Sequence, residues 1–229
     1  MRNCFVVLAL AAAVGSASCR PTDSPAGAGP PAPASVNADA ALESPAPAAG
    51  PRIVALGDSL TAGLGLTPEQ AYPALLQQRL DAAGLDYEVV NAGSSGDTSA
   101  GGLSRLEWAL AGDVRVLILA LGGNDALRGL PPEELRRNLG QIIERAQARR
   151  IAVVLAGMEA PPNFGTAYVV SFHQVYPDLA AQYGVPLVPF LLNRVAGVES
   201  LNQRDGIHPT AEGQKRVAEN VWKVLQTLL

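Results

Sequence analysis

The chain has 229 residues, of which 48% are hydrophobic and 17% are charged, and its formal net charge is -4 at pH 7. This length and composition predict one globular domain with a substantial core and an additional segment at one end. No basic stripe is present to neutralise phosphates, so we expect no nucleic-acid partner.

The N-terminus has the pattern of a secretory signal peptide. Arg2 supplies a positive charge, residues 4–14 form an apolar run too short to span a bilayer, and small residues follow before Cys19. The alternative, a buried core helix, is disfavoured because no amphipathic pattern accompanies the run. We therefore predict a signal peptide at residues 1–18 and export to the periplasm.

Cys19 follows directly on these small residues, and this junction resembles the lipobox of bacterial lipoproteins. The resemblance implies that the Cys19 thiol is acylated and anchors the protein to a membrane. The usual leucine three places earlier is Ser16 here, so ordinary cleavage near Ala17 or Ser18 is the alternative, with a soluble periplasmic or secreted product. Because Cys4 would leave with the signal, Cys19 would be the lone cysteine and no internal disulfide is expected.

Residues 19–51 consist largely of Pro, Ala, Gly and small polar residues, and no aromatic residue occurs among them. Such a composition buries too little apolar surface to offset the entropy of ordering. We predict a Pro/Ala-rich disordered linker, extended by its prolines, that spaces the domain from the membrane. An unselected tail is the alternative interpretation. The folded domain is then expected over residues 52–229.

Short apolar runs alternate with stretches of helical character through the rest of the chain. Uninterrupted apolar runs are typical of parallel strands that are covered on both faces. The predicted strands are residues 53–56, 88–90, 114–121, 151–156 and 186–190. The predicted helices are residues 68–83, 101–110, 130–146, 167–183 and 209–228. This alternation predicts an α/β protein, a three-layer α/β/α domain with a parallel sheet.

Chemically suggestive segments follow these predicted strands. The carboxyl ends of parallel strands meet at one edge of a sheet, where functional loops gather. Ser59, Asp205 and His208 lie in such loops. A serine hydroxyl becomes a nucleophile when a histidine takes its proton and a carboxylate orients that histidine. These three residues are therefore the candidate catalytic triad, although Ser59 alone would also suit a helix cap.

Hydrogen-bond donors for an oxyanion can be assigned to the same loops. Gly96 leaves its backbone amide accessible, Asn124 offers a side-chain amide, and the backbone amide of Ser59 would be a third donor. Singly, a glycine in a turn and an asparagine capping a helix are the simpler interpretations. Asp58 is assigned to loop structure, and His173, which has no aspartate nearby in the sequence, to the surface or to packing.

Four segments together resemble the conserved blocks of the SGNH (GDSL) hydrolase family, and the resemblance extends from Arg52 to the C-terminus. They are Gly57-Asp58-Ser59-Leu60, Gly96-Asp97-Thr98, Gly122-Gly123-Asn124-Asp125 and Asp205-Gly206-Ile207-His208-Pro209. The resemblance is to the bacterial thioesterase I, lysophospholipase and arylesterase branch. It implies a flavodoxin-like five-stranded sheet with order 2-1-3-4-5 and an acyl-enzyme mechanism without a metal or organic cofactor. It gives Ser59, Asp205 and His208 the catalytic roles and Ser59, Gly96 and Asn124 the oxyanion hole.

The substrate is predicted from residues at positions that border the acyl groove in relatives, namely Leu127, Leu130, Ala160, Pro161 and Phe164. Their apolar character favours acyl chains, so we expect small-molecule esters of short to medium acyl chains, or lysophospholipids, hydrolysed by a monomer. Thioesters are chemically suitable, but an exported enzyme meets little acyl-CoA. The alternatives are an acetyl esterase acting on envelope polysaccharide and a non-catalytic flavodoxin-like binding module.

Overall fold

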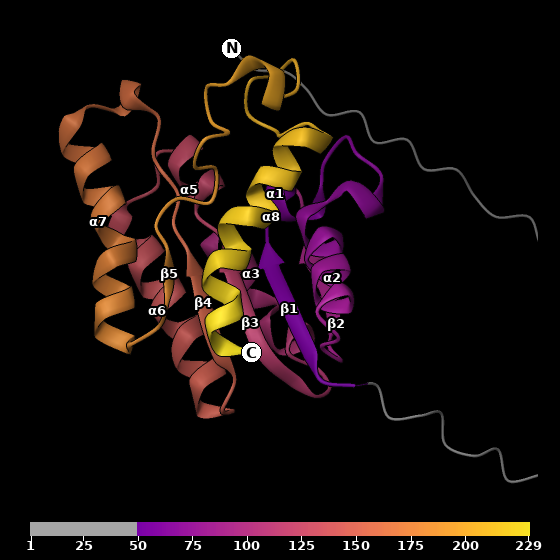
Figure 1. Cartoon of the computed structure of the whole chain (residues 1–229). Helices are drawn as coiled ribbons and strands as arrows, with labels where there is room; N and C mark the ends of the chain where they lie inside the picture. The colour runs from indigo at the N-terminus through magenta and orange to yellow at the C-terminus, as the bar shows by residue number, and fades with distance from the viewer. Residues whose placement is uncertain (1–49) are drawn as a thin grey trace, which may run out of the picture. The chain divides into compact units, whose positions relative to one another are not determined.

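A computed structural model describes residues 50–229 (Figure 1). The predicted signal peptide, Cys19 and nearly all of the predicted linker lie outside the described residues. Within the described part of the chain, no helix combines the length and apolar character needed to cross a membrane. Near the start, the Arg52 amide donates to the Asp113 carbonyl at 2.8 Å, which joins the first strand to the segment that precedes the third.

A parallel sheet of five strands forms the centre of this structure, with the order β2-β1-β3-β4-β5. The strands are β1 (Arg52–Gly57), β2 (Glu88–Gly93), β3 (Val114–Ala120), β4 (Ala152–Ala156) and β5 (Leu187–Val188). The predicted α/β class and strand order are confirmed. β2 continues three residues beyond its predicted end, whereas β5 has only two residues of the five predicted.

Helices cover both faces of the sheet (Figure 1). The α-helices are α1 (Ser59–Ala62), α2 (Tyr72–Ala82), α3 (Ser99–Ser104), α4 (Leu106–Ala109), α5 (Gly123–Leu127), α6 (Pro132–Ala148), α7 (Thr166–Tyr183) and α8 (Ala211–Leu225). Short 3₁₀ helices are η1 (Pro68–Gln70), η2 (Pro162–Phe164), η3 (Glu199–Leu201) and η4 (Gln226–Leu228). α2 packs beside α8, while α6 packs between α3 and α7.

Two predicted helices are divided in the structure. The helix predicted from residue 68 becomes η1 and α2, because Ala71 between them is extended (φ -69°, ψ 145°) and Pro73 lies in the first turn of α2. The helix predicted at 101–110 is divided into α3 and α4 at Arg105. The Arg105 guanidinium bonds to Asp97 at 2.6 Å and to the Gly57 carbonyl at 2.8 Å, so this break is tied to the sheet edge.

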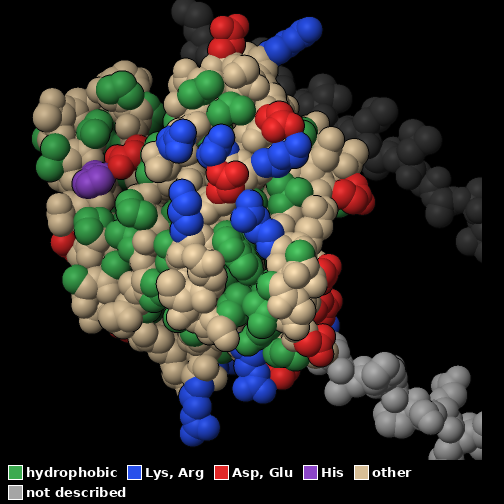
Figure 2. Space-filling model, in the orientation of Figure 1, with side chains coloured by type: hydrophobic (Ala, Val, Ile, Leu, Met, Phe, Trp, Pro, Cys, Tyr) green, Lys and Arg blue, Asp and Glu red, His purple; other side chains and the backbone are tan. Residues whose placement is uncertain are grey.

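The long helices follow the expected amphipathic pattern. In α8, the buried side includes Val217, Val221 and Leu225, which repeat at a helical spacing. Figure 2 shows Lys and Arg side chains mixed with acidic ones over the outer face of this helix. The ion pairs of Lys215 with Glu212 and of Arg216 with Glu219 lie three residues apart along it. α8 therefore separates the core from solvent on this face of the sheet.

Two glycines allow α1 to pack closely against the ends of β1 and β2. A Cβ atom at Gly57 would overlap with the Thr61 side chain, and one at Gly93 would overlap with the backbone of Ala62. Only glycine leaves room for so close an approach. The start of α1, where Ser59 lies, is therefore fixed against the carboxyl edge of the sheet.

Candidate active site

Ser59 is the first residue of α1, directly after the end of β1. The preceding Asp58 caps this short helix, since its Oδ1 accepts a hydrogen bond from the Leu60 amide at 3.0 Å. The helix ends at Gly63, which has a left-handed conformation (φ 77°). These features direct the chain sharply away from the sheet and leave the Ser59 side chain partly exposed beside a cavity.

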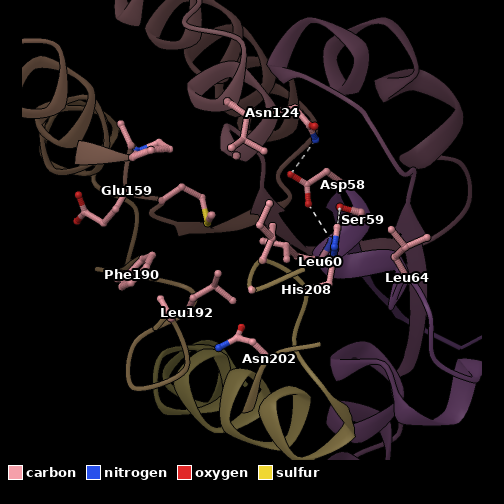
Figure 3. Close-up of a pocket in the computed structure, with 18 of the residues that line it drawn as sticks. Asp58, Ser59, Leu60, Leu64, Asn124, Glu159, Phe190, Leu192, Asn202 and His208 are labelled. Atoms are coloured by element: carbon pink, nitrogen blue, oxygen red, sulfur yellow. Dashed lines mark hydrogen bonds between the residues drawn. The ribbon is translucent and has the colours of Figure 1, made fainter. Parts of the chain in front are cut away.

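His208 and Asp205 reach Ser59 from a loop that is 149 residues further along the chain. The Nε2 atom of His208 lies 2.9 Å from the Ser59 Oγ, and its Nδ1 lies 2.6 Å from the Asp205 Oδ2. Figure 3 shows Ser59 and His208 side by side at one end of the cavity. Because an ionised carboxylate can only accept, Nδ1 carries the proton and Nε2 is left to accept the serine proton.

Asp205 is held by more than the histidine ring. Its Oδ1 also accepts hydrogen bonds from the backbone amides of Ile207, at 2.9 Å, and of His208, at 3.0 Å. The hydrogen bond from His208, followed by these amides, holds the pKa of the Asp205 carboxyl well below its usual range. Asp205 is therefore ionised at neutral pH and fixes the tautomer of His208.

Gly96 and Asn124 line the same cavity as Ser59. Gly96 has a positive φ of 87°, a backbone conformation that residues other than glycine rarely adopt. The Arg128 guanidinium donates to the Gly96 carbonyl at 2.8 Å and orients this peptide. Asn124, in α5, donates through Nδ2 to the Asp97 carbonyl at 2.9 Å and to Asp58 at 3.4 Å. The structure thus brings the three predicted oxyanion donors to one edge of the sheet.

Asp58 has a larger role in this site than the sequence indicated. Its side chain is buried, and this desolvation raises the pKa of the carboxyl to about 6, against the opposing effects of the Leu60 amide and the charge of His208. Its second oxygen faces the Asn124 amide, as the dashed line in Figure 3 shows. Asp58 therefore links the nucleophile helix to Asn124, besides forming the predicted loop structure.

The cavity beside the triad has a volume of about 530 Å³. Of the five predicted groove residues, Leu127, Ala160 and Pro161 line it. Beyond the five predicted residues, further apolar lining comes from Leu60, Leu64, Met158, Pro162, Phe190, Leu192, Ala196 and Ile207. These residues lie in four separate segments of the chain, so no local sequence pattern connects them.

The other two predicted groove residues, Leu130 and Phe164, do not line the cavity. The Leu130 carbonyl accepts a hydrogen bond from the Tyr168 hydroxyl at 2.8 Å, and the Phe164 ring lies 5.4 Å from the Tyr168 ring. Phe164 also covers the backbone of Gly129. Tyr168 of α7 thus draws both residues into a contact between loops, outside the space beside Ser59.

His173, the second histidine of the chain, lies in α7 and contacts Glu159 rather than Ser59. Its side chain is 55% exposed, which agrees with the predicted surface position. Within residues 50–229, no group of three or more His, Cys, Asp or Glu side chains is arranged to hold a metal ion.

Comparison with known proteins places this site in a family. The model of the GDSL-like lipase/acylhydrolase family matches residues 55–216. The chain belongs to this family. The match includes the loops that carry Ser59, Gly96, Asn124, Asp205 and His208, and it confirms the resemblance that their motifs indicated.

Several members of the GDSL family are similar over most of their length. Esterase TesA of Pseudomonas aeruginosa is 48% identical over 183 residues, which are 80% of this chain and 91% of the relative. Thioesterase 1/protease 1/lysophospholipase L1 of Escherichia coli is 38% identical over 80% of this chain and 86% of its own length. A crystal structure of TesA superposes with a TM-score of 0.75 at 48% identity, covering 79% of this chain and 100% of that one.

Proposed function

We propose that the protein is a serine esterase that hydrolyses carboxylic esters of short to medium acyl chains, or lysophospholipids, through an acyl-enzyme. The observation that carries this proposal is the chain of hydrogen bonds from Ser59 to His208 to Asp205 at one end of a largely apolar cavity. Membership of the GDSL family supports the same reaction class.

The geometry supports a two-step mechanism. His208 takes the Ser59 proton through Nε2 while the Ser59 oxygen attacks the ester carbonyl, and the oxyanion accepts hydrogen bonds from the Ser59 and Gly96 amides and from Asn124. The tetrahedral intermediate collapses when His208 returns the proton to the departing alcohol, which leaves an acyl-Ser59 ester. Water that is deprotonated by His208 then attacks this ester, and the carboxylic acid leaves as Ser59 recovers its proton.

The cavity supports an acyl chain as the group that is bound. Its volume of about 530 Å³ falls within the range of small-molecule sites, and its lining is apolar apart from a few polar side chains. The names of the relatives include an esterase and a lysophospholipase, which favours lipid-like esters over sugars. A thioester is chemically equivalent for this site, and the name of one relative includes thioesterase activity.

Two alternatives from the sequence are less well supported. A non-catalytic binding module would not need a histidine nitrogen 2.9 Å from a serine hydroxyl and a carboxylate 2.6 Å behind it. An acetyl esterase for envelope polysaccharide would leave most of the apolar cavity unused.

A panel of nitrophenyl esters from acetate to palmitate tests the reaction and the substrate class. We expect the highest kcat/KM for an ester longer than acetate, and Ser59→Ala should lower kcat on the order of 10⁴-fold or more. A fluorophosphonate probe should label the wild type and leave the Ser59→Ala variant unlabelled. A strict preference for acetate would instead favour the polysaccharide alternative, and an unlabelled wild type would exclude a serine hydrolase.

The location of the enzyme rests on the sequence of residues 1–19. A positive start, an apolar run and small residues before Cys19 support export and a lipid anchor that holds the domain at the periplasmic face of a membrane. Cleavage without lipidation, giving a soluble periplasmic or secreted enzyme, is the alternative. We expect the enzyme to act as a monomer, since the residues of the triad and oxyanion hole all come from one chain.

A further inference from the structure

A second histidine–carboxylate pair lies at the edge of the cavity. The Nδ1 atom of His173, in α7, is 2.7 Å from the Oε1 atom of Glu159, which follows β4. Figure 2 shows a histidine beside an acidic side chain at the surface over α7. The two partners are 14 residues apart in the chain and come from different elements, so no sequence pattern indicates that they pair.

Glu159 has an unusual place among the residues that line the cavity. Apart from Asp58 and His208, which belong to the catalytic end, it is the one charged side chain lining the cavity within residues 50–229. Figure 3 shows Glu159 on the side of the cavity opposite to Ser59, with its carboxylate turned away from the centre. The neighbouring lining residues are apolar, among them Met158, Ala160 and Phe190.

Glu159 of this pair also lies in a segment that makes few other hydrogen bonds. Gly157 is bonded to the β5 side through the Val188 carbonyl and the Leu191 amide, each at 2.8 Å. Residues 158–160, which come next, make a single hydrogen bond to the rest of the described chain, and in it the Glu159 carboxylate accepts from His173. Met158 and Ala160 are held by packing in the core, so this bond to α7 is the polar contact that positions the Glu159 side chain.

Stability of the fold is a poor explanation for this pair. The Glu159 side chain is 35% exposed and that of His173 is 55% exposed, and exposed pairs of this kind contribute little to the free energy of unfolding. An acyl chain that extends past the apolar lining, by contrast, would have to separate the two groups or pass the charged carboxylate. Either event removes hydrogen bonds from a charged group, which is unfavourable.

We propose that the Glu159–His173 pair is a specificity-determining latch that closes the far end of the cavity and limits the length of the acyl chain. This inference rests on the proposed function, in which the cavity receives the acyl group. Glu159 forms the end of the wall, and His173 acts as a positioning residue through its hydrogen bond to Glu159.

The ratio of kcat/KM for nitrophenyl laurate to that for nitrophenyl butyrate tests the latch, because inactive protein in a preparation cancels from this ratio. We expect the ratio to rise about fivefold or more in Glu159→Ala and in His173→Ala. The double variant should rise no further than the larger single effect, because the two side chains act as one unit. Glu159→Gln keeps a hydrogen bond to His173 but removes the charge, so its ratio should lie between those of the wild type and of Glu159→Ala.

Asp178→Asn is the matched control. Asp178 lies in α7, as His173 does, and forms an ion pair with Arg136 at 2.7 Å, but it does not line the cavity. The laurate-to-butyrate ratio of the Asp178→Asn variant should therefore equal that of the wild type. Unchanged ratios in Glu159→Ala and His173→Ala, in an active esterase, would overturn the latch alone. Additive effects in the double variant would also overturn it. A wild type that hydrolyses neither ester would overturn the proposed function together with the latch.

Discussion

Asp205 accepts three hydrogen bonds, which explains how a carboxylate with 46% of its side chain exposed can orient a histidine. Two of the bonds come from the backbone amides of Ile207 and His208 in its own loop, so the carboxylate is held independently of the His208 ring. A pKa below the usual range means that the contribution of Asp205 to stability is present above the unfolded-state pKa and is lost only as pH falls through the folded-state value. The acid member of the triad therefore remains charged at any pH near neutral.

Asp58 behaves in the opposite way, and its burial predicts a pH-dependent stability. Its pKa rises from 3.8 to about 6 in the folded protein. The contribution of Asp58 to the free energy of unfolding is therefore complete below pH 3.8 and is lost as pH rises through about 6. This rise corresponds to about 3 kcal/mol as an order of magnitude. We therefore compare the unfolding free energy of Asp58→Asn with that of the wild type at about pH 4 and at pH 7.5. From the lower pH to the higher, the difference should shift in favour of Asp58→Asn by up to that amount.

Urea unfolding of the wild type and of Asp58→Asn at both pH values measures this difference. The Asn side chain can still accept from the Leu60 amide, so the helix cap is kept while the charge is removed. A difference in unfolding free energy that is the same at both pH values would show that the Asp58 carboxyl is not perturbed by burial.

At the scale of elements, Gln214 connects the two halves of the site. This buried side chain of α8 accepts from the Tyr72 amide at 2.9 Å and donates to the Leu60 carbonyl at 3.0 Å. It thus joins the nucleophile helix α1 and the start of α2 to the helix that follows His208. Because Ser59 and His208 lie on either side of this link, the link helps to keep the distance between them.

Replacing Gln214 by leucine leaves two buried backbone groups without partners. Each such group costs about 1–3 kcal/mol, so we expect a loss of about 2–6 kcal/mol in the free energy of unfolding. A lower kcat should accompany it, since α1 and α8 lose their connection. Gln226→Leu, in the exposed η4, is the matched control and should leave both quantities unchanged. Equal effects in the two variants would argue against the link.

The sequence predicted the elements better than the contacts between them. Buried parallel strands leave a local signal, an uninterrupted apolar run, and this signal predicts the five strands and the α/β class. The strand order, which the family resemblance implies, is confirmed as well. The break at Arg105 was missed because its cause is an ion pair with Asp97 and a bond to Gly57, neither of which is visible as a pattern.

The same distinction applies to the site. Ser59, Gly96, Asn124, Asp205 and His208 belong to short motifs, and the structure gathers all five at the carboxyl edge of the sheet. Leu130 and Phe164 were expected in the groove because they match positions that border it in relatives and are apolar, but apolar side chains also pack against one another, and Tyr168 holds both elsewhere. The pairing of Glu159 with His173 depends on the tertiary arrangement of β4 and α7, which the sequence does not display.

At the scale of the whole molecule, the proposed location of the enzyme depends on the prediction for its N-terminal segment. If the prediction for residues 1–19 is correct, mass spectrometry of protein from the membrane fraction should show a mature chain that begins at an acylated Cys19. Cys19→Ala should abolish the acylation and release the enzyme from the membrane fraction. A mature terminus before Cys19, with an unmodified thiol, would contradict the lipid anchor and favour the soluble form.

The cavity has two walls that are held in place in different ways, and the contact of α1 with Gly57 and Gly93 fixes one of them. The wall that bears Ser59 is set by close packing of α1 on two glycines, where any added side chain would displace the helix. The opposite wall, at residues 158–160, packs through Met158 and Ala160 and has one side-chain hydrogen bond, which Glu159 accepts from His173. Reactivity and substrate range are thereby assigned to separate parts of the chain, so sequence changes at the second wall can alter which esters fit while the bond-breaking machinery stays intact.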